Sequence, residues 1–458
     1  MVVVQKSKSG MSTEPVVIVG AGWAGLAAAV KLTEQGHQVI IFESAKQAGG
    51  RARGVHFNDM DVDNGQHLLI GAYTECLSLM ETVGININTS LKRLPLLLTV
   101  INKPTIEKEK NTLTLQAPAL PAPLHLLYAL ITAKGLTFKD KVSGIKFGLT
   151  LKKYNYAFEQ DVSVKELFNR TKQTQTLIQQ LWEPLCLATM NTAIEDASAN
   201  VFMRIFKDAF TIKTKHTDSL LPSTDLSNLF PNAAIDFIEK NGGKVIPKSR
   251  VESIDVNNNE VSSVKVKVGS ETETVKTSQV IIATAPQNLN KLISQYPILA
   301  PTSKNIDQFN YEPIVTVYLK YADEAHLPQA MMGLTSTISQ WVFDRGCFCQ
   351  QSGLFSVVIS ANGAHMSMDD DTLTQIVHDE VSALLGEKPA LINAFVIREK
   401  RATFACTKNI NNLRPKNTTA INGLYLAGDY TDTGYPATLE GAVRSGITAS
   451  NLIIEKRP

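Results

Sequence analysis

The chain has 458 residues, of which 19% are charged, and its formal net charge is +2 at pH 7. It is longer than one ordinary domain and can bury large hydrophobic cores, and its near-neutral charge gives no sign of a nucleic-acid partner. Its cysteines are odd in number and have no metal-ligand spacing, which favours reduced thiols and predicts no metal site: Cys76, Cys186, Cys347, Cys349 and Cys406.

Residues 1–13 are expected to form a disordered tail, and Met11 is a candidate for the natural start of translation. The apolar residues at the very start are too few for the core of a signal peptide. No run of about 18 apolar residues follows that would span a membrane. The sequence therefore predicts a cytoplasmic protein.

The first predicted unit has the order strand, helix, strand. An apolar strand at 16–19 leads into the pattern GxGxxG at 20–25, a helical run follows at 26–32, and a second apolar strand at 39–42 ends before Glu43. This order is typical of the βαβ unit that binds a dinucleotide. The strand before the glycines, the helix after them and the acid at the end make the signal specific.

Each residue of the glycine motif has a physical role in such a unit. Gly20 permits the tight turn, Gly22 lets the backbone approach a pyrophosphate, and Gly25 lets helix and strand pack closely. The helix N-terminus offers N–H groups and the positive end of its dipole to the phosphates. Glu43 lies at the spacing where an acid accepts hydrogen bonds from a ribose.

A second glycine pair follows this acid and favours FAD over NAD. Gly49 and Gly50 let the chain pass close to a bound group. Arg51 can bond a phosphate or the edge of a flavin with its forked guanidinium.

The stretch at 113–138 contains three prolines and then an almost wholly apolar segment. It lacks the polar face of an ordinary amphipathic surface helix. Two interpretations stay open at this point. The segment is either a buried helix of a second domain or a patch that rests on the inner face of the bacterial cell membrane and admits a lipid substrate.

Hydrophobic spacing predicts the remaining elements. Helices are expected at 164–169, 171–186, 199–210 and 232–240, and the region from about 96 to 225 looks mostly helical. Strands are expected at 244–247, 250–254, 261–268, 273–275 and 280–286, and a second sheet at 314–319, 354–359 and 391–397. The expected fold is α/β, with a discontinuous Rossmann-like FAD-binding domain at 14–95, 226–286 and 398–455 and a mixed α+β substrate domain at 96–225 and 287–397.

The C-terminal part repeats the strand-to-helix order. A strand at 423–429 ends in Gly428 and Asp429, and a helix is expected from Pro436, since proline suits the first helical turn. The Asp429 carboxylate can hold a ribitol hydroxyl. The positive end of the helix dipole can face the flavin edge that becomes negative on reduction.

Four sequence blocks resemble the squalene-associated, FAD-dependent desaturase-like proteins, the hydroxysqualene dehydroxylases of bacterial hopanoid pathways, within the amine oxidase and phytoene desaturase superfamily. The blocks are VVIVGAGWAGLAAAVKL, AGGRARG, VDNGQHLLIGAY and LYLAGDYTDTGYPATLEGAVRSG, and WEPLCLATMNT supports them. The first two are shared across the superfamily. The last two are more similar to its desaturase branch, and the likeness covers residues 16–452.

The motifs and the resemblance imply FAD that is bound non-covalently, because no cysteine lies in the final block. The residues assigned to the cofactor are Gly20, Gly22, Trp23, Ala24, Gly25, Glu43, Gly49, Gly50, Arg51, Gly65, Val251, Gly428, Asp429, Thr438 and Leu439.

The resemblance also implies that the third block passes beside the flavin ring, which makes His67 and Gln66 the candidate catalytic residues. His67 can protonate a leaving hydroxyl, or it can merely hydrogen-bond the flavin or the backbone. Glu183 is a further candidate acid, although a solvated or capping glutamate fits its position equally.

The activity implied by the resemblance is reductive removal of the hydroxyl group of hydroxysqualene. The substrate is a long apolar isoprenoid, so a long apolar tunnel lined from the second domain is expected. The electron donor is left open. The alternatives are a carotenoid or phytoene desaturase-type enzyme, an amine oxidase, and a non-catalytic flavoprotein that presents a lipid. The amine oxidase is disfavoured because Thr438 stands where an aromatic cage residue is expected.

Overall fold

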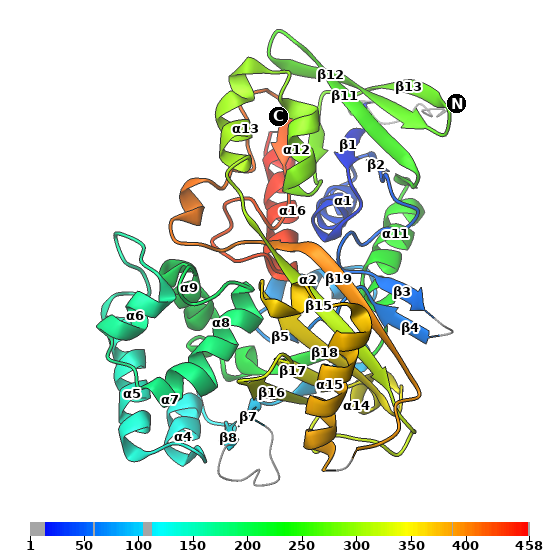
Figure 1. Ribbon diagram of the computed structural model, residues 1–458. Coiled ribbons are helices and arrows are strands. Elements are labelled where there is room, and N and C mark those ends of the chain that lie inside the picture. Colours follow the sequence, from blue (N-terminus) through cyan, green and yellow to red (C-terminus); the bar gives the residue numbers. More distant parts are fainter. Residues whose placement is uncertain (1–13, 58–59, 104–111, 387, 457–458) are drawn as a thin grey trace.

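The computed structural model describes residues 14–57, 60–103, 112–386 and 388–456, so the tail expected at residues 1–13 lies outside the described part. Figure 1 shows a parallel sheet in the upper half of the molecule and a larger sheet below it, with a group of helices beside the larger sheet.

The parallel sheet has five strands in the order β10–β2–β1–β14–β20, and every pairing in it is parallel. The strands are β1 Val16–Val19, β2 Val39–Phe42, β10 Lys244–Ile246, β14 Val280–Ile282 and β20 Leu424–Leu426. Strands β1, β2 and β14 are buried along their whole length because both faces of the sheet are covered. The expected α/β fold with a Rossmann-like sheet is confirmed.

Three helices cover one face of this sheet: α1 Trp23–Glu34, α11 Pro231–Lys240 and α16 Leu439–Ile454. Helices α1 and α16 approach each other closely at Gly446, where a Cβ atom would lie 2.1 Å from the carbonyl oxygen of Ala24. Any side chain at position 446 would therefore push the C-terminal helix away from the helix that follows the glycine turn.

The other face is covered by α12 Pro286–Ile293 and by an antiparallel three-stranded sheet. Its strands are β11 Ser249–Asn257, β12 Glu260–Val268 and β13 Glu271–Lys276. These strands were expected from their alternating pattern, and the structure confirms them.

The second large sheet has seven strands in the order β19–β15–β18–β17–β16–β7–β8. They are β7 Leu97–Asn102, β8 Thr112–Gln116, β15 Tyr311–Lys320, β16 Met331–Thr335, β17 Trp341–Asp344, β18 Leu354–Ser360 and β19 Asn393–Phe404. Helix α15, Asp370–Leu385, packs on one face of it. The region from about 96 to 225 was expected to be mostly helical, and helices predominate in it, but its start forms β7 and β8 of this sheet.

The helices beside this sheet are α4 Leu124–Thr132, α5 Phe138–Lys153, α6 Val164–Arg170, α7 Gln175–Leu177, α8 Glu183–Met190 and α9 Ala199–Phe210. The helix expected at 171–186 is present but begins at Gln175, runs on to Met190 and contains a π-helical turn. Helix α6 ends before Thr171, Thr174 caps the next helical segment with its side chain, and a π-helical turn at Ile178–Trp182 precedes α8. Pro184 is tolerated because it stands in the first turn of α8.

The stretch at 113–138 is neither a fully buried helix nor a single helix. It contributes most of β8 and then α4, and α5 begins at its end. On α4 the side chains of His125, Ala129 and Leu130 are buried. Those of Leu124, Leu127, Tyr128 and Ile131 are exposed, so one face of the helix is apolar and open.

The C-terminal helix begins at Leu439, three residues after the predicted start at Pro436. The Thr438 hydroxyl accepts a hydrogen bond from the backbone N–H of Gly441 at 3.1 Å and so caps the helix. The proline lies in the preceding loop.

Shorter elements connect the two large sheets. They are β3 Gly54–Phe57, β4 Met60–Asp63, β5 Leu69–Ile70, β6 Leu91–Leu94 and β9 Ser219–Pro222, with α2 Thr74–Thr82, α3 Ile87–Ser90, α10 Leu226–Leu229, α13 Ala300–Ile306 and α14 Gly346–Cys349. The division of the chain into an FAD-binding and a substrate domain at the boundaries given above stays a prediction.

Candidate active site

A cavity of about 940 Å³ lies where the parallel sheet meets the second sheet and the helices. It is lined by every residue that the sequence assigns to the cofactor, except Gly25, and by His67 and Gln66, but not by the further candidate acid Glu183. Segments that are far apart in the chain thus converge on one space: the glycine turn, the 49–51 loop, the 65–67 segment, Val251 and the start of α16.

The glycine turn has the geometry that its motif predicts. Gly20 has φ +107°, and a Cβ atom there would lie 2.9 Å from the Ala283 carbonyl oxygen. At Gly25 a Cβ atom would lie 2.0 Å from the carbonyl oxygen of Gly20, which explains its place behind the cavity wall. At Gly22 a Cβ atom would meet nothing within 4 Å, so the backbone of this residue is open to a bound group in the cavity.

Glu43 is fixed by two backbone N–H groups. One carboxylate oxygen accepts from Ala21 and the other from Ala45, each at 2.7 Å. The first bond ties the acid to the glycine turn. Its carboxylate lines the cavity and can accept further bonds from ribose hydroxyls.

The 49–51 loop packs against the glycine turn and brings Arg51 to Asp429. Gly49 donates its N–H to the Ala21 carbonyl at 2.8 Å, and the Arg51 guanidinium lies 2.6 Å from the Asp429 carboxylate. Arg51 also donates to the Ala402 carbonyl. The two side chains that were assigned separately to the cofactor therefore form one ion pair in the cavity wall.

These residues fit an extended dinucleotide. Gly22 leaves open space for a pyrophosphate, and Glu43 presents acceptors for a ribose. At the other end of the cavity, Thr438 and Leu439 place the N-terminus of α16 at the wall, with its dipole favouring negative charge there.

His67 is held through its ring by the backbone. Its Nδ1 lies 2.8 Å from the carbonyl oxygen of Gly65, so Nδ1 carries the proton and donates it to this bond. Burial lowers the pKa of His67 below its usual value, and the charge of Arg51 lowers it further. The neutral ring is therefore favoured near pH 7, which leaves Nε2 as a hydrogen-bond acceptor and weakens the expectation of an imidazolium acid.

Gln66 is committed to the protein scaffold. Its side-chain oxygen accepts from Arg345 at 2.8 Å and from Ser356 at 2.9 Å, and its NH₂ group donates to the His67 carbonyl at 3.0 Å. This arrangement supports a role in positioning the 65–67 segment rather than in proton transfer.

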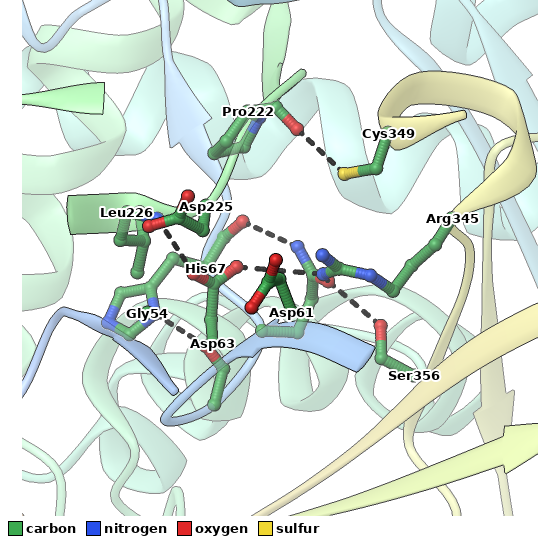
Figure 2. Close-up of polar contacts among 12 residues, drawn as sticks. Gly54, Asp61, Asp63, His67, Pro222, Asp225, Leu226, Arg345, Cys349 and Ser356 are labelled. Carbon is green, nitrogen blue, oxygen red and sulfur yellow. Dashed lines mark hydrogen bonds and ion pairs between the residues drawn. The ribbon is translucent and has the colours of Figure 1, made fainter. Parts of the chain in front are cut away.

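Figure 2 shows a network of polar contacts around Arg345 and Asp63, and Arg345 joins it to the side-chain oxygen of Gln66. The nearest guanidinium nitrogen of Arg345 lies 3.6 Å from the Asp63 carboxylate, which also accepts the N–H of Leu226 at 2.7 Å. Burial raises the pKa of Asp63 to about 6, against the opposing effect of Arg345. The network joins β4, β18, α10 and the N-cap residue of α14, Arg345, around the candidate catalytic segment. Sequence reasoning missed it, since Arg345 lies far from the motif.

The remainder of the cavity wall is mainly apolar and comes largely from the second sheet and the helices. It includes Leu97, Leu185, Phe202, Phe206, Phe210, Met331, Trp341 and Phe343. A long apolar chain fits such a wall, as the sequence led us to expect. Glu183, the other candidate acid, is not among the lining residues.

A few polar side chains interrupt this wall, and Asp208, His216 and Tyr435 among them were missed by sequence reasoning. Tyr73, Asp208, His216 and Tyr435 all line the cavity. Tyr73 and Tyr435 belong to recognised sequence blocks, whereas nothing in the local pattern distinguishes Asp208 from a solvated residue of an amphipathic helix. Within the described ranges, no group of three or more His, Cys, Asp or Glu side chains is arranged to hold a metal ion.

Comparisons with known proteins agree with this geometry. A family model described as flavin containing amine oxidoreductase matches residues 23–454. The chain is 27% identical to hydroxysqualene dehydroxylase of Zymomonas mobilis over 95% of its length and 98% of that protein. It is 24% identical to the 15-cis-phytoene desaturase of Glycine max over 96% of its length and 79% of that protein.

Among solved structures, an oxidoreductase from Methanosarcina mazei superposes with a TM-score of 0.72 at 14% identity. The superposition covers 96% of this chain and 99% of that one. At this identity the likeness concerns the fold alone.

Proposed function

This chain belongs to the family of flavin containing amine oxidoreductases, and from that premise we propose that it removes the hydroxyl group of hydroxysqualene by reduction, with non-covalent FAD. The observation that carries the proposal is the single cavity that joins the dinucleotide residues to a long apolar wall. The full-length similarity to a hydroxysqualene dehydroxylase supports this substrate.

The residues that would hold FAD are those of the glycine turn, Glu43, the Arg51–Asp429 pair and the N-terminus of α16. Bound in its reduced form, FAD would supply a hydride to the carbon that loses the hydroxyl group, and a proton from solvent water would convert the departing oxygen to water. The apolar wall binds the isoprenoid chain and excludes water. Each buried CH₂ contributes ~0.8 kcal/mol to such binding.

His67 has an orienting role in this proposal. Its Nδ1–H is used by Gly65, so its Nε2 can accept a hydrogen bond from the water that donates a proton to the departing oxygen. Gln66, held by Arg345 and Ser356, fixes the backbone beside it. The buried ion pair of Arg345 with Asp63 keeps this support rigid.

The direction of the reaction separates this proposal from its main alternative, a desaturase that oxidises its isoprenoid. We expect reduced protein under anaerobic conditions to convert hydroxysqualene to a product that mass spectrometry shows to lack one oxygen. Oxidised protein should leave phytoene unchanged. Desaturated phytoene from the second incubation, with no deoxygenated product from the first, would favour the alternative.

We expect FAD to be released when the protein is precipitated with acid or heat. Among the described residues that line the cavity none is a cysteine, so no thioether to the flavin is available there. Absorbance of the supernatant measures the released flavin. Flavin that stays with the pellet would contradict non-covalent binding.

The open face of α4 supports entry of the substrate from a lipid bilayer. Tyr128 and Ile131 are 50% and 52% exposed, and Phe138 at the start of α5 is 83% exposed. Lys134 lies between Ile131 and Phe138 in the sequence, Lys139 follows Phe138, and both suit anionic lipid headgroups. The Leu120 carbonyl accepts a hydrogen bond from Thr214, close in sequence to the cavity residue His216. In the described part of the chain no helix has the length and apolar character needed to cross a membrane.

Replacement of Leu127 by glutamate should weaken binding to anionic liposomes at least tenfold and leave the flavin spectrum unchanged. The side chain is 40% exposed, so the change removes apolar contact with lipid without opening the core. Flotation in a sucrose gradient measures the bound fraction. The matched control is Ile392→Glu, which changes an exposed side chain 64% accessible on a different part of the molecule. Equal flotation of both variants, or wild type that never floats, would contradict contact through α4.

A further inference from the structure

A polar cluster interrupts the apolar wall of the cavity on the side of α9. Asp208 accepts a hydrogen bond from the Tyr435 hydroxyl at 2.5 Å and one from Nε of Arg204 at 2.8 Å. The ring of His216 lies within hydrogen-bond distance, 3.0 Å, of the backbone carbonyl of Asp208. Asp208, Tyr435 and His216 all line the cavity.

Tyr435 is held firmly in this cluster. Its ring is buried, and the guanidinium groups of Arg204 and Arg444 lie 5.2 and 5.1 Å from the ring centre. Arg444 is fixed in turn by the buried carboxylate of Glu440 at 2.8 Å. Burial raises the pKa of Tyr435 to about 12, so its hydroxyl stays protonated and remains a donor to Asp208.

Both side-chain hydrogen bonds to Asp208 converge on one carboxylate oxygen, Oδ2. Within the part of the chain that the structure describes, Oδ1 receives no hydrogen bond, and the side chain is 16% exposed at the cavity wall. A carboxylate oriented by two donors and left with one open oxygen is an acceptor for a neutral hydroxyl group.

We propose that Asp208, oriented by Tyr435 and Arg204, recognises the hydroxyl group of the substrate and makes the cavity select an isoprenoid alcohol over the corresponding hydrocarbon. This inference rests on the proposed function and names the residue that sets its substrate class. An alcohol replaces the water at Oδ1 with its own hydrogen bond. A hydrocarbon displaces that water and leaves the carboxylate desolvated, which is the physical basis of strong selection for a hydroxyl group.

Binding without turnover tests the proposal. Oxidised protein with bound FAD cannot donate a hydride, so hydroxysqualene and squalene can be titrated in turn while the change in flavin absorbance is followed. The measured quantity is the ratio of the two dissociation constants. A merely structural link between α9 and the 435 loop would change both constants together and would leave their ratio unaltered.

We expect wild type to prefer hydroxysqualene, and Asp208→Ala to reduce that preference roughly 10- to 100-fold, the factor expected for one charge-assisted hydrogen bond. The matched control is Glu166→Ala, because Glu166 also pairs with an arginine four residues away but lies outside the cavity lining. Tyr435→Phe, which keeps the ring and removes the donor to Asp208, should give a smaller loss of preference. It carries the test if Asp208→Ala fails to retain FAD.

An unchanged ratio in Asp208→Ala, or in Tyr435→Phe where the first variant does not fold, overturns the proposal. Wild type that binds both ligands equally also overturns it. Failure of the proposed function is distinguishable, because it would show as absence of deoxygenated product from reduced wild type while the preference for the alcohol persists in the oxidised protein.

Discussion

Replacement of Glu43 by lysine should remove FAD from the purified protein almost completely. The carboxylate accepts the N–H groups of Ala21 and Ala45 and lies where a ribose would bind. Hydrogen bonds to a charged group contribute about 1.5–3 kcal/mol each, so the loss of even one weakens binding by about 10- to 150-fold. Lysine would also present donors where the ribose needs acceptors. The ratio of flavin absorbance to protein absorbance measures occupancy.

The control for this change is Glu183→Gln. Glu183 is a half-buried acid on α8 that lies outside the cavity lining, so its variant should purify with FAD at the wild-type ratio. A Glu43→Gln variant, which keeps one acceptor oxygen, should fall between wild type and Glu43→Lys. Equal flavin occupancy in Glu43→Lys and Glu183→Gln would contradict the assignment of Glu43 to the ribose.

Replacement of His67 by alanine should keep FAD bound but slow flavin reoxidation by hydroxysqualene by roughly 10²- to 10⁴-fold, the range for loss of a positioned acid–base group. The proposed reason is loss of the Nε2 acceptor that orients the water from which the departing oxygen takes its proton. Stopped-flow absorbance of dithionite-reduced protein gives the rate. A rate within threefold of wild type would make His67 a scaffold residue, and Tyr73 would become the next candidate. Loss of FAD from the variant would instead assign His67 to cofactor binding.

The pH dependence separates the two roles of His67. Because burial lowers its pKa, the neutral ring prevails above that lowered value and the proposed acceptor is fully present near pH 7. We therefore expect a wild-type rate that is steady between about pH 6.5 and pH 8. A rate that decreases steadily as the pH rises from about 5 to 7 would show that the imidazolium form is required, as the sequence first suggested.

The cofactor half of the site could be predicted from the sequence because its geometry is local. Gly20, Gly22 and Gly25 act through backbone conformation and close approach, and those constraints are visible in a motif of six residues. The strand before it and the acid after it follow one another along the chain. The C-terminal strand and helix could also be predicted from their local sequence. Only the start of α16 was wrong, because Thr438 caps the helix and it begins after this residue.

The substrate half could not be predicted because its contacts are long-range. Arg345, directly after β17, contacts Gln66 and Asp63, which lie about 280 residues earlier in the chain, and no local pattern reports such a contact. In the sequence, Asp208 looks like an ordinary polar residue of a helix. Its contact with Tyr435, which lies far along the chain, is visible only in the folded structure. Strands β7 and β8 were also missed. They pair with each other, and only β7 joins the rest of the sheet, through its pairing with the distant strand β16.

The structure of the apolar stretch at 113–138 could not be predicted from its composition. Composition alone cannot separate a buried helix from one that is apolar on both faces. The structure divides it into a strand and two helices and buries only one face of α4. What covers the other face is the subject of the liposome experiment.

The most direct test of the central claim is anaerobic mixing of dithionite-reduced, FAD-loaded protein with hydroxysqualene, with flavin absorbance followed and the products measured by mass spectrometry. Reductive dehydroxylation predicts that the flavin is reoxidised and that one squalene molecule forms for each flavin, while buffer or squalene leaves the flavin reduced. A flavin that stays reduced in the presence of hydroxysqualene as long as it does in buffer would contradict the account.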